Sequence, residues 1–226
     1  MGKIVCFFHV ATMGHYKEVN EEMLNCMESS GFLDRIDTLY ISCIESHPLD
    51  LPDKFKRDKI KIINQGLDIG QFEYPTLESL KDYCFNNPND IVVYCCNAGV
   101  SHSKDKKDLY PGWRLLKSHF TFNRWRDNLK ALKIYDVCGI EWQTEPKPHF
   151  SGNFWWANAT YINTLPSIEK SRQLGLRLFR PFRHGAEMWL GMNPKCQYRS
   201  LFQTGYDWLN RPVINWYEEA KRCEKL

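Results

Sequence analysis

The sequence lacks a long hydrophobic run, an excess of charge of either sign, and any linker rich in proline, glycine or serine. No stretch approaches the ~20 consecutive apolar residues that cross a bilayer, so we expect no membrane span. The 30 basic residues nearly balance the 27 acidic ones. This argues against a nucleic-acid partner, because proteins dedicated to nucleic acids carry a dominant basic surface. Without linkers or internal repeats, residues 1–226 are predicted to form a single domain.

The sequence also lacks the motifs of several common sites. It has no GxGxxG or P-loop glycine pattern, which argues against a Rossmann dehydrogenase and a kinase. It has nine cysteines, but no two of them have the spacing of metal ligands. Most lie inside apolar runs, where a free thiol behaves as a small hydrophobe. With no secretory signal, we expect a reducing, cytoplasmic compartment and a chain that starts at or near Met1.

Aromatic side chains are abundant, with 8 Trp, 11 Tyr and 13 Phe. Together they supply more apolar area than a disordered chain leaves unburied, which excludes intrinsic disorder. Their distribution is uneven, because every tryptophan lies between Trp113 and Trp216. We therefore expect the two halves of the domain, residues 1–100 and 101–226, to have different roles.

The first half alternates patterns typical of strands and helices. Residues 3–10 form a near-continuous apolar run, which suits a strand buried on both faces. The remaining patterns predict strands over residues 36–44, 59–63 and 90–96, and helices over 17–29 and 76–85. This alternation indicates an α/β fold with a central, mainly parallel sheet flanked by helices. In such sheets, ligands bind beyond the carboxyl ends of the strands.

The second half opens with a polar segment, residues 101–111, which suits either a mobile lid or a plain solvated connection. Residues 112–132 predict one long amphipathic helix, and residues 135–142 a further strand. The sequence HFSGNFWWANATY follows over residues 149–161. We interpret it as an exposed cluster around a glycine that lets the backbone turn sharply.

The adjacent Trp155 and Trp156 allow two interpretations. Neighbouring side chains point to opposite sides of a strand, so at most one is predicted to be a simple core residue. A flat aromatic face beside amide and hydroxyl groups is typical of a surface that stacks on sugars. Burial in the core is nevertheless the more frequent role of any single tryptophan, and both interpretations stay open.

Glu187 is the candidate catalytic carboxylate. It follows a basic cluster that ends in Arg183 and His184, and a short helix starting at Gly185 would place it in the first turn. A carboxylate at that position either stabilises the helix N-terminus or takes a proton from a hydroxyl nucleophile as a general base. The sequence leaves both roles open.

Four segments together resemble a known family. They are FEYPTLESL at 72–80, a strand ending in GVS at 99–101, HFSGNFWWA at 149–157 and AEMW at 186–189. This set is similar to a group of small GT-A glycosyltransferases from bacteria and large DNA viruses, some of them involved in viral capsid glycosylation. The resemblance extends over about residues 3–189.

The resemblance implies a single GT-A-like (Rossmann-like) domain, which can be part of a longer protein. It implies transfer of a sugar from a nucleotide-sugar donor, by default a UDP-sugar, to a hydroxyl of a glycan or glycoprotein acceptor, with inversion. Residues 1–100 would hold the nucleotide and residues 101–226 the sugar donor and acceptor, with Glu187 as the base. The nucleotide would contact Val10, Ala11, Thr12, Cys96, Asn97 and Ala98. The sugar or diphosphate would contact Arg114, His149, Ser151, Asn153, Trp155, Trp156 and Arg183.

One departure from the family concerns the cofactor. Many GT-A enzymes hold Mn²⁺ or Mg²⁺ on the donor diphosphate with an Asp-x-Asp motif, but this chain has none and carries Cys96 and Ala98 at that place. Negative charge still develops on the leaving group as the glycosidic bond breaks. Either fewer ligands hold a metal, or basic residues such as Arg114, Arg180, Arg183 and the lysines after Ser101 replace it. We therefore name no metal ligands.

Two other functions compete with sugar transfer. A carbohydrate-binding module, or a degenerate transferase without activity, would account for the tryptophans and for the missing Asp-x-Asp. A glycoside hydrolase would need two carboxylates flanking the scissile bond, for which Glu141 and Glu145 are candidates.

Overall fold

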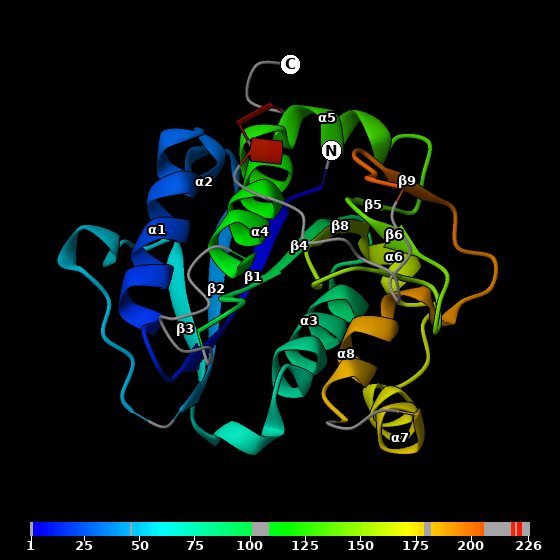
Figure 1. The fold of residues 1–226 in the computed structure, drawn as a ribbon, viewed down its shortest axis with the longest axis horizontal. Coiled ribbons are helices and arrows are strands. Elements are labelled where there is room, and N and C mark those ends of the chain that lie inside the picture. The colour runs from blue at the N-terminus through cyan, green and yellow to red at the C-terminus, as the bar shows by residue number, and fades with distance from the viewer. Residues whose placement is uncertain are drawn as a thin grey trace.

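A central sheet of seven strands organises the protein (Figure 1). The structure is a computed structural model that describes residues 2–45, 47–100, 109–178, 182–205, 218–219 and 221–222. The strand order is β3-β2-β1-β4-β8-β5-β9. The strands are β1 (Ile4–Thr12), β2 (Thr38–Glu45), β3 (Ile60–Asp68), β4 (Ile91–Cys96), β5 (Val137–Gly139), β8 (Trp155–Asn158) and β9 (Tyr198–Ser200).

The sheet is mainly parallel, as predicted. β1 pairs in parallel with β2 and β4, and β2 with β3. β8 is antiparallel to both of its neighbours, β4 and β5, while β5 and β9 are parallel. A separate two-stranded sheet joins β6 (Trp142–Gln143) to β7 (His149–Phe150). The predicted fold class, a mainly parallel sheet flanked by helices, is therefore confirmed.

Helices cover both faces of the sheet. On one face Phe8 and Trp156 pack with α1 (Tyr16–Ser29) and α2 (Phe32–Arg35). On the other face Phe7 and Trp155 pack with α3 (Tyr74–Asn86) and α6 (Ala159–Ile162). The remaining helices are α4 (Leu109–Ser118), α5 (Trp125–Ala131), α7 (Ile168–Leu178) and α8 (His184–Met188), with short turns η1 (Asp53–Phe55), η2 (Ile69–Gln71) and η5 (Leu190–Met192). Within the described ranges, no helix has the length and apolar character needed to cross a membrane.

The two adjacent tryptophans correct one prediction. Trp155 and Trp156 are 1% and 0% exposed, so both are core residues rather than at most one. They do point to opposite faces of β8, as the alternation of a strand requires. Because helices cover both faces of the sheet, each ring meets its own core cluster. Neither ring has an open face on which a sugar could stack.

The predicted single helix over residues 112–132 is also wrong. A π-helical turn, η4 (His119–Asn123), separates α4 from α5. Such a turn frees backbone carbonyls from the regular ladder. Here Trp156 Nε1 donates to the carbonyl of Thr121 at 3.1 Å, and Asn128 Nδ2 to that of Phe120 at 2.7 Å. Of the predicted lid at 101–111, residues 101–108 lie outside the described residues.

Candidate functional site

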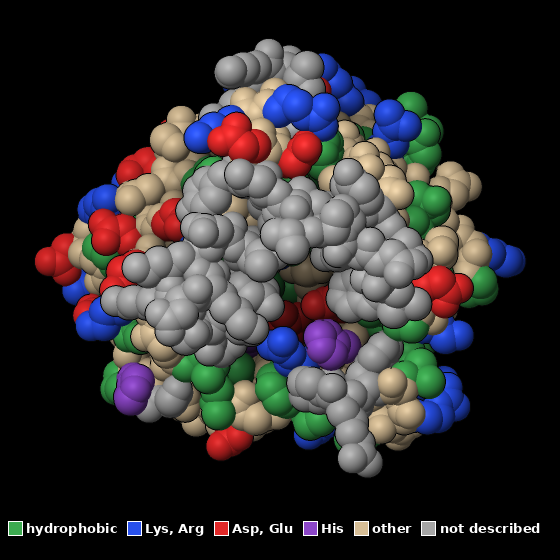
Figure 2. All heavy atoms as spheres, viewed as in Figure 1, with side chains coloured by type: hydrophobic (Ala, Val, Ile, Leu, Met, Phe, Trp, Pro, Cys, Tyr) green, Lys and Arg blue, Asp and Glu red, His purple; other side chains and the backbone are tan. Residues whose placement is uncertain are grey.

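Five polar side chains from separate segments meet near the carboxyl ends of β1 and β4. We call them the buried polar cluster: Glu73 before α3, Cys96 at the end of β4, Lys117 of α4, Asn153 before β8 and Glu187 of α8. Cys96, Lys117 and Asn153 are buried, and the two glutamates at its rim are partly buried. Asn153 contacts Glu73 directly, and the charge of Glu187 acts on both Glu73 and Lys117. On the face shown in Figure 2, acidic side chains lie recessed in a hollow, with a basic and a histidine side chain beside them.

The glycine turn at Gly152 lies at the base of this cluster. Its φ of 79° belongs to the left-handed region that favours glycine, as the sequence predicts. Its carbonyl accepts from Lys117 Nζ at 3.2 Å and from Cys96 Sγ at 3.8 Å. A Cβ on Gly152 would lie 2.4 Å from Lys117 Nζ, so a side chain here would displace the lysine. The turn therefore requires glycine for its backbone and for its packing.

The segment around this turn is not the exposed cluster that we predicted. His149, Ser151 and Asn153 are 0%, 2% and 1% exposed. Their hydrogen bonds explain why: His149 Nδ1 donates to the Lys147 carbonyl at 2.7 Å, and the Ser151 amide donates to the Glu141 carbonyl at 3.0 Å. A polar segment can be buried when its polar groups find such partners.

Asn153 connects the core to the cluster. The indole Nε1 of Trp155 donates to Asn153 Oδ1 at 2.7 Å, and Asn153 Nδ2 donates to Glu73 Oε2. The Trp155 ring stacks on Tyr94, with ring centroids 5.2 Å apart. Because the indole N–H can only donate, it fixes which end of the Asn153 amide faces Glu73. The chain Trp155–Asn153–Glu73 thus holds the carboxyl in one orientation.

Glu73 has the most perturbed carboxyl of the cluster. Its pKa is raised to about 7, first by burial and then by the charge of Glu187. The hydrogen bond from Asn153 and the charge of Arg183 act in the opposite direction. Glu73 precedes α3, where the helix dipole also favours the ionised form. Burial outweighs these effects, so Glu73 keeps its proton up to about neutral pH.

A buried polar network fixes the start of α3 and thereby the position of Glu73. Thr76 of α3 donates to Ser42 Oγ of β2 at 2.8 Å, and its hydroxyl is hydrogen-bonded to His9 Nδ1 of β1 at 2.7 Å. Burial lowers the pKa of His9 to about 3, so His9 is neutral at physiological pH. α3 is therefore attached to strands β1 and β2 by uncharged groups.

Lys117 is a fully buried lysine, 0% exposed. Burial lowers its pKa to about 8, while the charges of Glu187 and Glu73 act to raise it. Its ammonium group lies 4.4 Å from the ring centroid of Phe154 and 5.1 Å from that of Trp113. Burial also raises the pKa of the neighbouring Cys96 thiol far above its ordinary range. At neutral pH the cluster thus contains one buried cation and a neutral thiol.

Glu187 lies in the first turn of α8, as predicted, although the helix begins at His184. Its side chain is 19% exposed, and its Oε1 lies 4.0 Å from His184 Nδ1. Its Oε2 is buried and has no hydrogen-bond partner among the residues that the structure describes. A buried carboxylate oxygen without a partner is costly, and any bound group that donates a hydrogen bond would satisfy it.

Close packing against α7 fixes α8. Ser171 Oγ of α7 donates to the Gly185 carbonyl at 2.6 Å, and a Cβ on Gly185 would lie 2.5 Å from the Ser171 carbonyl oxygen. The hydroxyl of Tyr74 donates to the Phe182 carbonyl at 2.9 Å. Because these contacts involve backbone atoms, Glu187 is held on a rigid element.

The residues predicted to bind the nucleotide do lie close together, at the carboxyl ends of β1 and β4. Asn97 joins the two strand ends, because it accepts from the Ala11 amide at 3.0 Å and donates to the Ala11 carbonyl at 3.1 Å. Thr12 Oγ1 donates to the His47 carbonyl at 2.5 Å. Among the six predicted residues, Val10, Thr12, Cys96 and Asn97 are buried, whereas Ala11 and Ala98 are partly exposed.

The two predicted arginines differ in their surroundings. Arg114 is 3% exposed, and its guanidinium donates to both Glu22 carboxylate oxygens and to the Ala98 carbonyl, each at 2.9 Å. In this structure it therefore joins α1 to the turn after β4. Arg183 is exposed, and its charge acts on Glu73.

The residues at the place of an Asp-x-Asp motif do not fit a metal site. Cys96 is a buried neutral thiol, and the amide of Asn97 is occupied by Ala11 and Asn20. The neighbouring Lys117 adds a positive charge. In the part of the chain that the structure describes, no three His, Cys, Asp or Glu residues are grouped to hold a metal ion.

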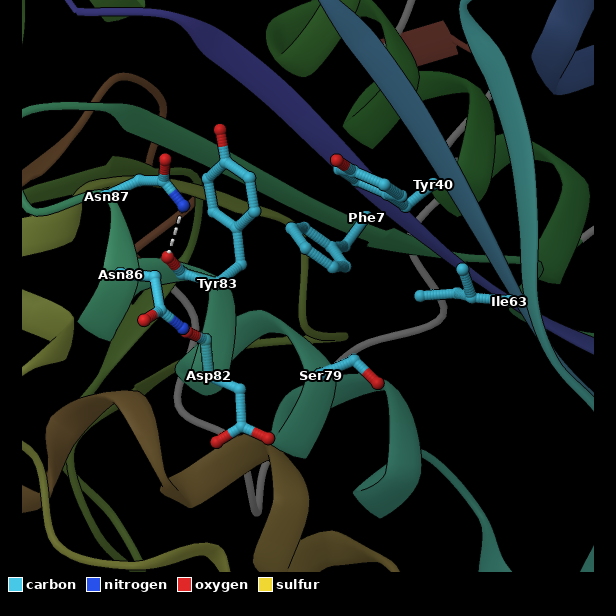
Figure 3. Close-up of a pocket in the computed structure, with 8 residues that line it drawn as sticks. All are labelled: Phe7, Tyr40, Ile63, Ser79, Asp82, Tyr83, Asn86 and Asn87. Atoms are coloured by element: carbon cyan, nitrogen blue, oxygen red, sulfur yellow. Dashed lines mark hydrogen bonds between the residues drawn. The ribbon is translucent and has the colours of Figure 1, made fainter.

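Two pockets lie away from the cluster. The pocket in Figure 3 has a volume of 260 Å³ between α3 and strands β1 to β3. Its Phe7 and Tyr40 rings stack with centroids 4.9 Å apart, beside Tyr83. A second pocket, of 420 Å³, lies beside Trp142 and Tyr198. None of the residues that line these two pockets was predicted for the site. The predicted residues Cys96, Asn153 and Glu187 meet in the buried polar cluster, and we place the candidate site there.

Comparison with known proteins gives the family. The profile of a domain of unknown function, DUF8361, matches residues 9–197. The chain belongs to this family. In this DUF8361 member, every residue of the buried polar cluster lies inside the matched range. No curated protein matches the sequence.

Several solved structures align with the chain at low identity and low TM-score. A 4-diphosphocytidyl-2C-methyl-D-erythritol synthase aligns over 100% of this DUF8361 chain and 98% of its own, with 11% identity and a TM-score of 0.40. The bifunctional IspDF from Campylobacter jejuni aligns over 97% of this chain and 54% of its own, with 11% identity and a TM-score of 0.41. The 2-C-methyl-D-erythritol 4-phosphate cytidylyltransferase from Thermus thermophilus aligns over 98% and 100%, with 8% identity and a TM-score of 0.39. Likenesses at this level carry no conclusion about function.

Sequence reasoning missed two residues of the cluster, Glu73 and Lys117. Lys117 had a detectable signal, because it lies four residues after Trp113 and three before Phe120, on the apolar face of its helix. Glu73 stands directly before Tyr74 and Pro75, a typical helix start. That pattern predicts a carboxylate at a helix N-terminus, but not its burial beside a second carboxylate.

Proposed function

We propose that this protein is a glycosyltransferase that moves a sugar from a nucleotide-sugar donor to a hydroxyl group of a glycan or glycoprotein acceptor. The reaction proceeds with inversion, a UDP-sugar is the expected donor, and Glu187 is the base. The observation that carries the proposal is the Glu187 carboxylate near the carboxyl ends of β1 and β4. It is partly exposed on a rigid helix, and one of its oxygens has no hydrogen-bond partner in the described residues.

The chemistry follows from that position. An acceptor hydroxyl must lose its proton as it attacks the anomeric carbon, and a positioned carboxylate within hydrogen-bond reach can take it. For inversion, the acceptor attacks from the face opposite the leaving diphosphate. The diphosphate would lie over the strand ends at Ala11 and Ala98, which are partly exposed. Open strand ends are where α/β sheets bind their ligands.

The leaving diphosphate needs positive charge near it. Because the residues at the Asp-x-Asp position do not fit a metal, we route no step through one. Besides Arg114, which is paired with Glu22, the described cations at the cluster are the exposed Arg183 and the buried Lys117. We propose that Arg183 contacts the diphosphate and that the positive charge of the buried Lys117 also acts on the diphosphate.

The competing functions have less support. A carbohydrate-binding module would use open aromatic faces, but Trp155 and Trp156 are both in the core. The carboxylates suggested for a hydrolase do not form a pair, because Glu141 is 2% exposed and accepts hydrogen bonds from the amide and hydroxyl of Thr204. Glu145 lies beyond β6, on the surface.

Ligand binding gives a first test of the proposal. Thermal unfolding is measured with UDP, with GDP and with free monosaccharides. A ligand that binds only the folded state stabilises it, so a transferase gains stability from a nucleotide. Stabilisation by free sugars alone would support the binding module instead.

Turnover gives the second test. Release of UDP from UDP-sugars is measured for the wild type, for Glu187→Gln and for a control, Glu18→Gln, on the exposed face of α1. Glu187→Gln keeps the shape but removes the base, and we expect a loss of about 10²- to 10⁴-fold in kcat with nucleotide binding intact. Near-normal transfer by Glu187→Gln would refute its role.

A further inference from the structure

The second pocket, of 420 Å³, lies between two segments that are distant in the sequence. One wall comes from β6 and the residue after it, and the other from β9 and the turn after it. The two walls include Trp142, Gln143, Thr144, Tyr198, Ser200 and Gln203. Sites for small molecules in proteins have volumes of about 300–1,000 Å³, so this pocket suits a small ligand or one unit of a larger one.

An aromatic platform forms the apolar part of the pocket. The ring of Tyr198 stacks on that of Trp142, with centroids 4.2 Å apart and an angle of 12° between the planes. Trp142 in turn packs edge-on against Phe150, with centroids 4.8 Å apart. Trp142 is 8% exposed, whereas Tyr198 is 42% exposed. The buried indole therefore holds the Tyr198 ring in place, and much of that ring is open to a ligand.

A buried hydrogen-bond donor borders the same pocket. Gln143 is 9% exposed, and its Nε2 has no hydrogen-bond partner among the residues that the structure describes. An unsatisfied buried donor is costly, and a bound group that accepts a hydrogen bond would satisfy it. Thr144 follows directly and adds an exposed hydroxyl to the pocket wall.

Hydrogen bonds between the two walls fix the shape of the pocket. Gln203 Nε2 donates to the Trp142 carbonyl at 3.1 Å, and the Trp142 amide donates to Ser200 Oγ at 3.4 Å. Directly beside the pocket, the Glu141 carboxylate accepts from the amide and the hydroxyl of Thr204, at 2.6 and 3.0 Å. A site whose walls are already connected needs little ordering when a ligand binds, which keeps the cost of binding low.

The pocket is suited to an uncharged ligand. None of the described residues that line it is acidic, and its one charged residue is the exposed Arg199. Arg199 follows Tyr198 on β9, and successive side chains of a strand point to opposite sides, so the two do not share a face. Recognition thus depends on an aromatic face and on neutral amide and hydroxyl groups. A sugar ring matches both, because it has a face of C–H groups and a rim of hydroxyls that donate and accept hydrogen bonds.

We propose that this pocket binds a neutral sugar ring, with the C–H face of the sugar on Tyr198 and one hydroxyl oxygen accepting from Gln143 Nε2. The sugar belongs to the acceptor glycan, and this part of the proposal rests on the proposed function. The chain connects the two sites directly. Gln143 of β6 pairs with His149 of β7, and β7 continues through the Gly152 turn to Asn153 of the buried polar cluster.

Sugar binding can be measured without a nucleotide. The indole signal of Trp142 in ¹H–¹⁵N spectra, assigned through Trp142→Phe, is followed during titration with the methyl glycosides of glucose, galactose, mannose, fucose, xylose and N-acetylglucosamine. We expect at least one glycoside to shift this signal, and Tyr198→Ala and Gln143→Leu each to weaken its Kd about 3- to 10-fold. Because Gln143→Leu removes an unsatisfied donor, its unfolding temperature should be no lower than that of the wild type.

The matched control is Phe85→Ala, which removes a 76% exposed aromatic ring of α3 outside the pocket and should leave Kd unchanged. The absence of a shift with every glycoside, or a Kd that Tyr198→Ala does not change, would overturn the proposal. A shift of the Trp142 signal by UDP but by no glycoside would also overturn it, since the pocket would then bind the nucleotide.

Turnover tests the link to the acceptor. With oligosaccharides of the sugar that binds as acceptors, Tyr198→Ala should raise KM more than it lowers kcat, because it removes binding rather than chemistry. An unchanged KM would overturn the acceptor role. If the wild type turns over no nucleotide-sugar, the proposed function fails, while the NMR titration still decides whether the pocket binds a sugar.

Discussion

Replacing Glu73 by glutamine should change how the stability of this protein depends on pH. Because the folded state raises the pKa of Glu73 from its ordinary 4.5 to about 7, the folded chain binds more protons than the unfolded chain between these pH values. Stability therefore falls as pH rises from about 4.5 to about 7. At 1.36 kcal/mol per pKa unit, the loss is at most about 3 kcal/mol, and partial exposure of Glu73 reduces it.

Glutamine cannot ionise, so the stability of Glu73→Gln should not fall in this way as pH rises from about 4.5 to about 7. The assay is urea unfolding, followed by tryptophan fluorescence at steps of half a pH unit from pH 4.5 to pH 8.5. We expect the variant to gain about 2 to 3 kcal/mol on the wild type between the two ends of this range. The exposed Glu18→Gln serves as the matched control. A difference between wild type and Glu73→Gln that stays constant across the range would refute the reasoning.

Three further substitutions test the supports of the cluster. Asn153→Ala removes the acceptor of a buried indole N–H and should cost about 1–3 kcal/mol in urea unfolding. Loss of its hydrogen bond to Glu73 should also raise the pKa of that carboxyl, which a ¹³C NMR titration of the glutamate carboxyls measures. Gly185→Ala places a Cβ 2.5 Å from the Ser171 carbonyl oxygen, so α8 must shift; we expect a loss of about 1–3 kcal/mol and of turnover. Burial lowers the pKa of Lys117 from 10.5 to about 8, so the folded chain binds fewer protons than the unfolded chain between these pH values, and the stability of the wild type should rise there. Lys117→Met should abolish this rise. An unchanged rise in the variant would show that Lys117 does not cause it.

The regular part of the fold could be predicted from local patterns. The apolar runs at residues 3–10 and 90–96 correspond to β1 and β4, and the amphipathic segment at 17–29 to α1. These elements follow from the period of their apolar residues alone. The break inside the predicted helix 112–132 could not be predicted from local patterns. The π-helical turn there is stabilised by the indole of Trp156, which is distant in the sequence.

Burial of the segment at 149–157 could not be predicted for a related reason. Its polar residues resemble a surface, and local sequence cannot show that distant partners satisfy them. In the structure Asn153 has Glu73 as one of its partners, 80 residues away. Glu187 could be proposed from the sequence because its neighbours in the chain are basic and aromatic. Glu73 could not, because its raised pKa comes first from burial and then from the charge of Glu187, which lies 114 residues away in the sequence.

The missing Asp-x-Asp motif is consistent with this arrangement of charges. An aspartate in place of Cys96 would bring a third carboxylate against Glu73 and Glu187, with Lys117 as the buried cation available to balance them. In a site of low dielectric, such an excess of negative charge is costly unless a cation is bound. With a neutral thiol at that position, the charge of Lys117 balances Glu187, and Glu73 keeps its proton. A neutral thiol at position 96 thus keeps a further negative charge away from Glu73 and Glu187.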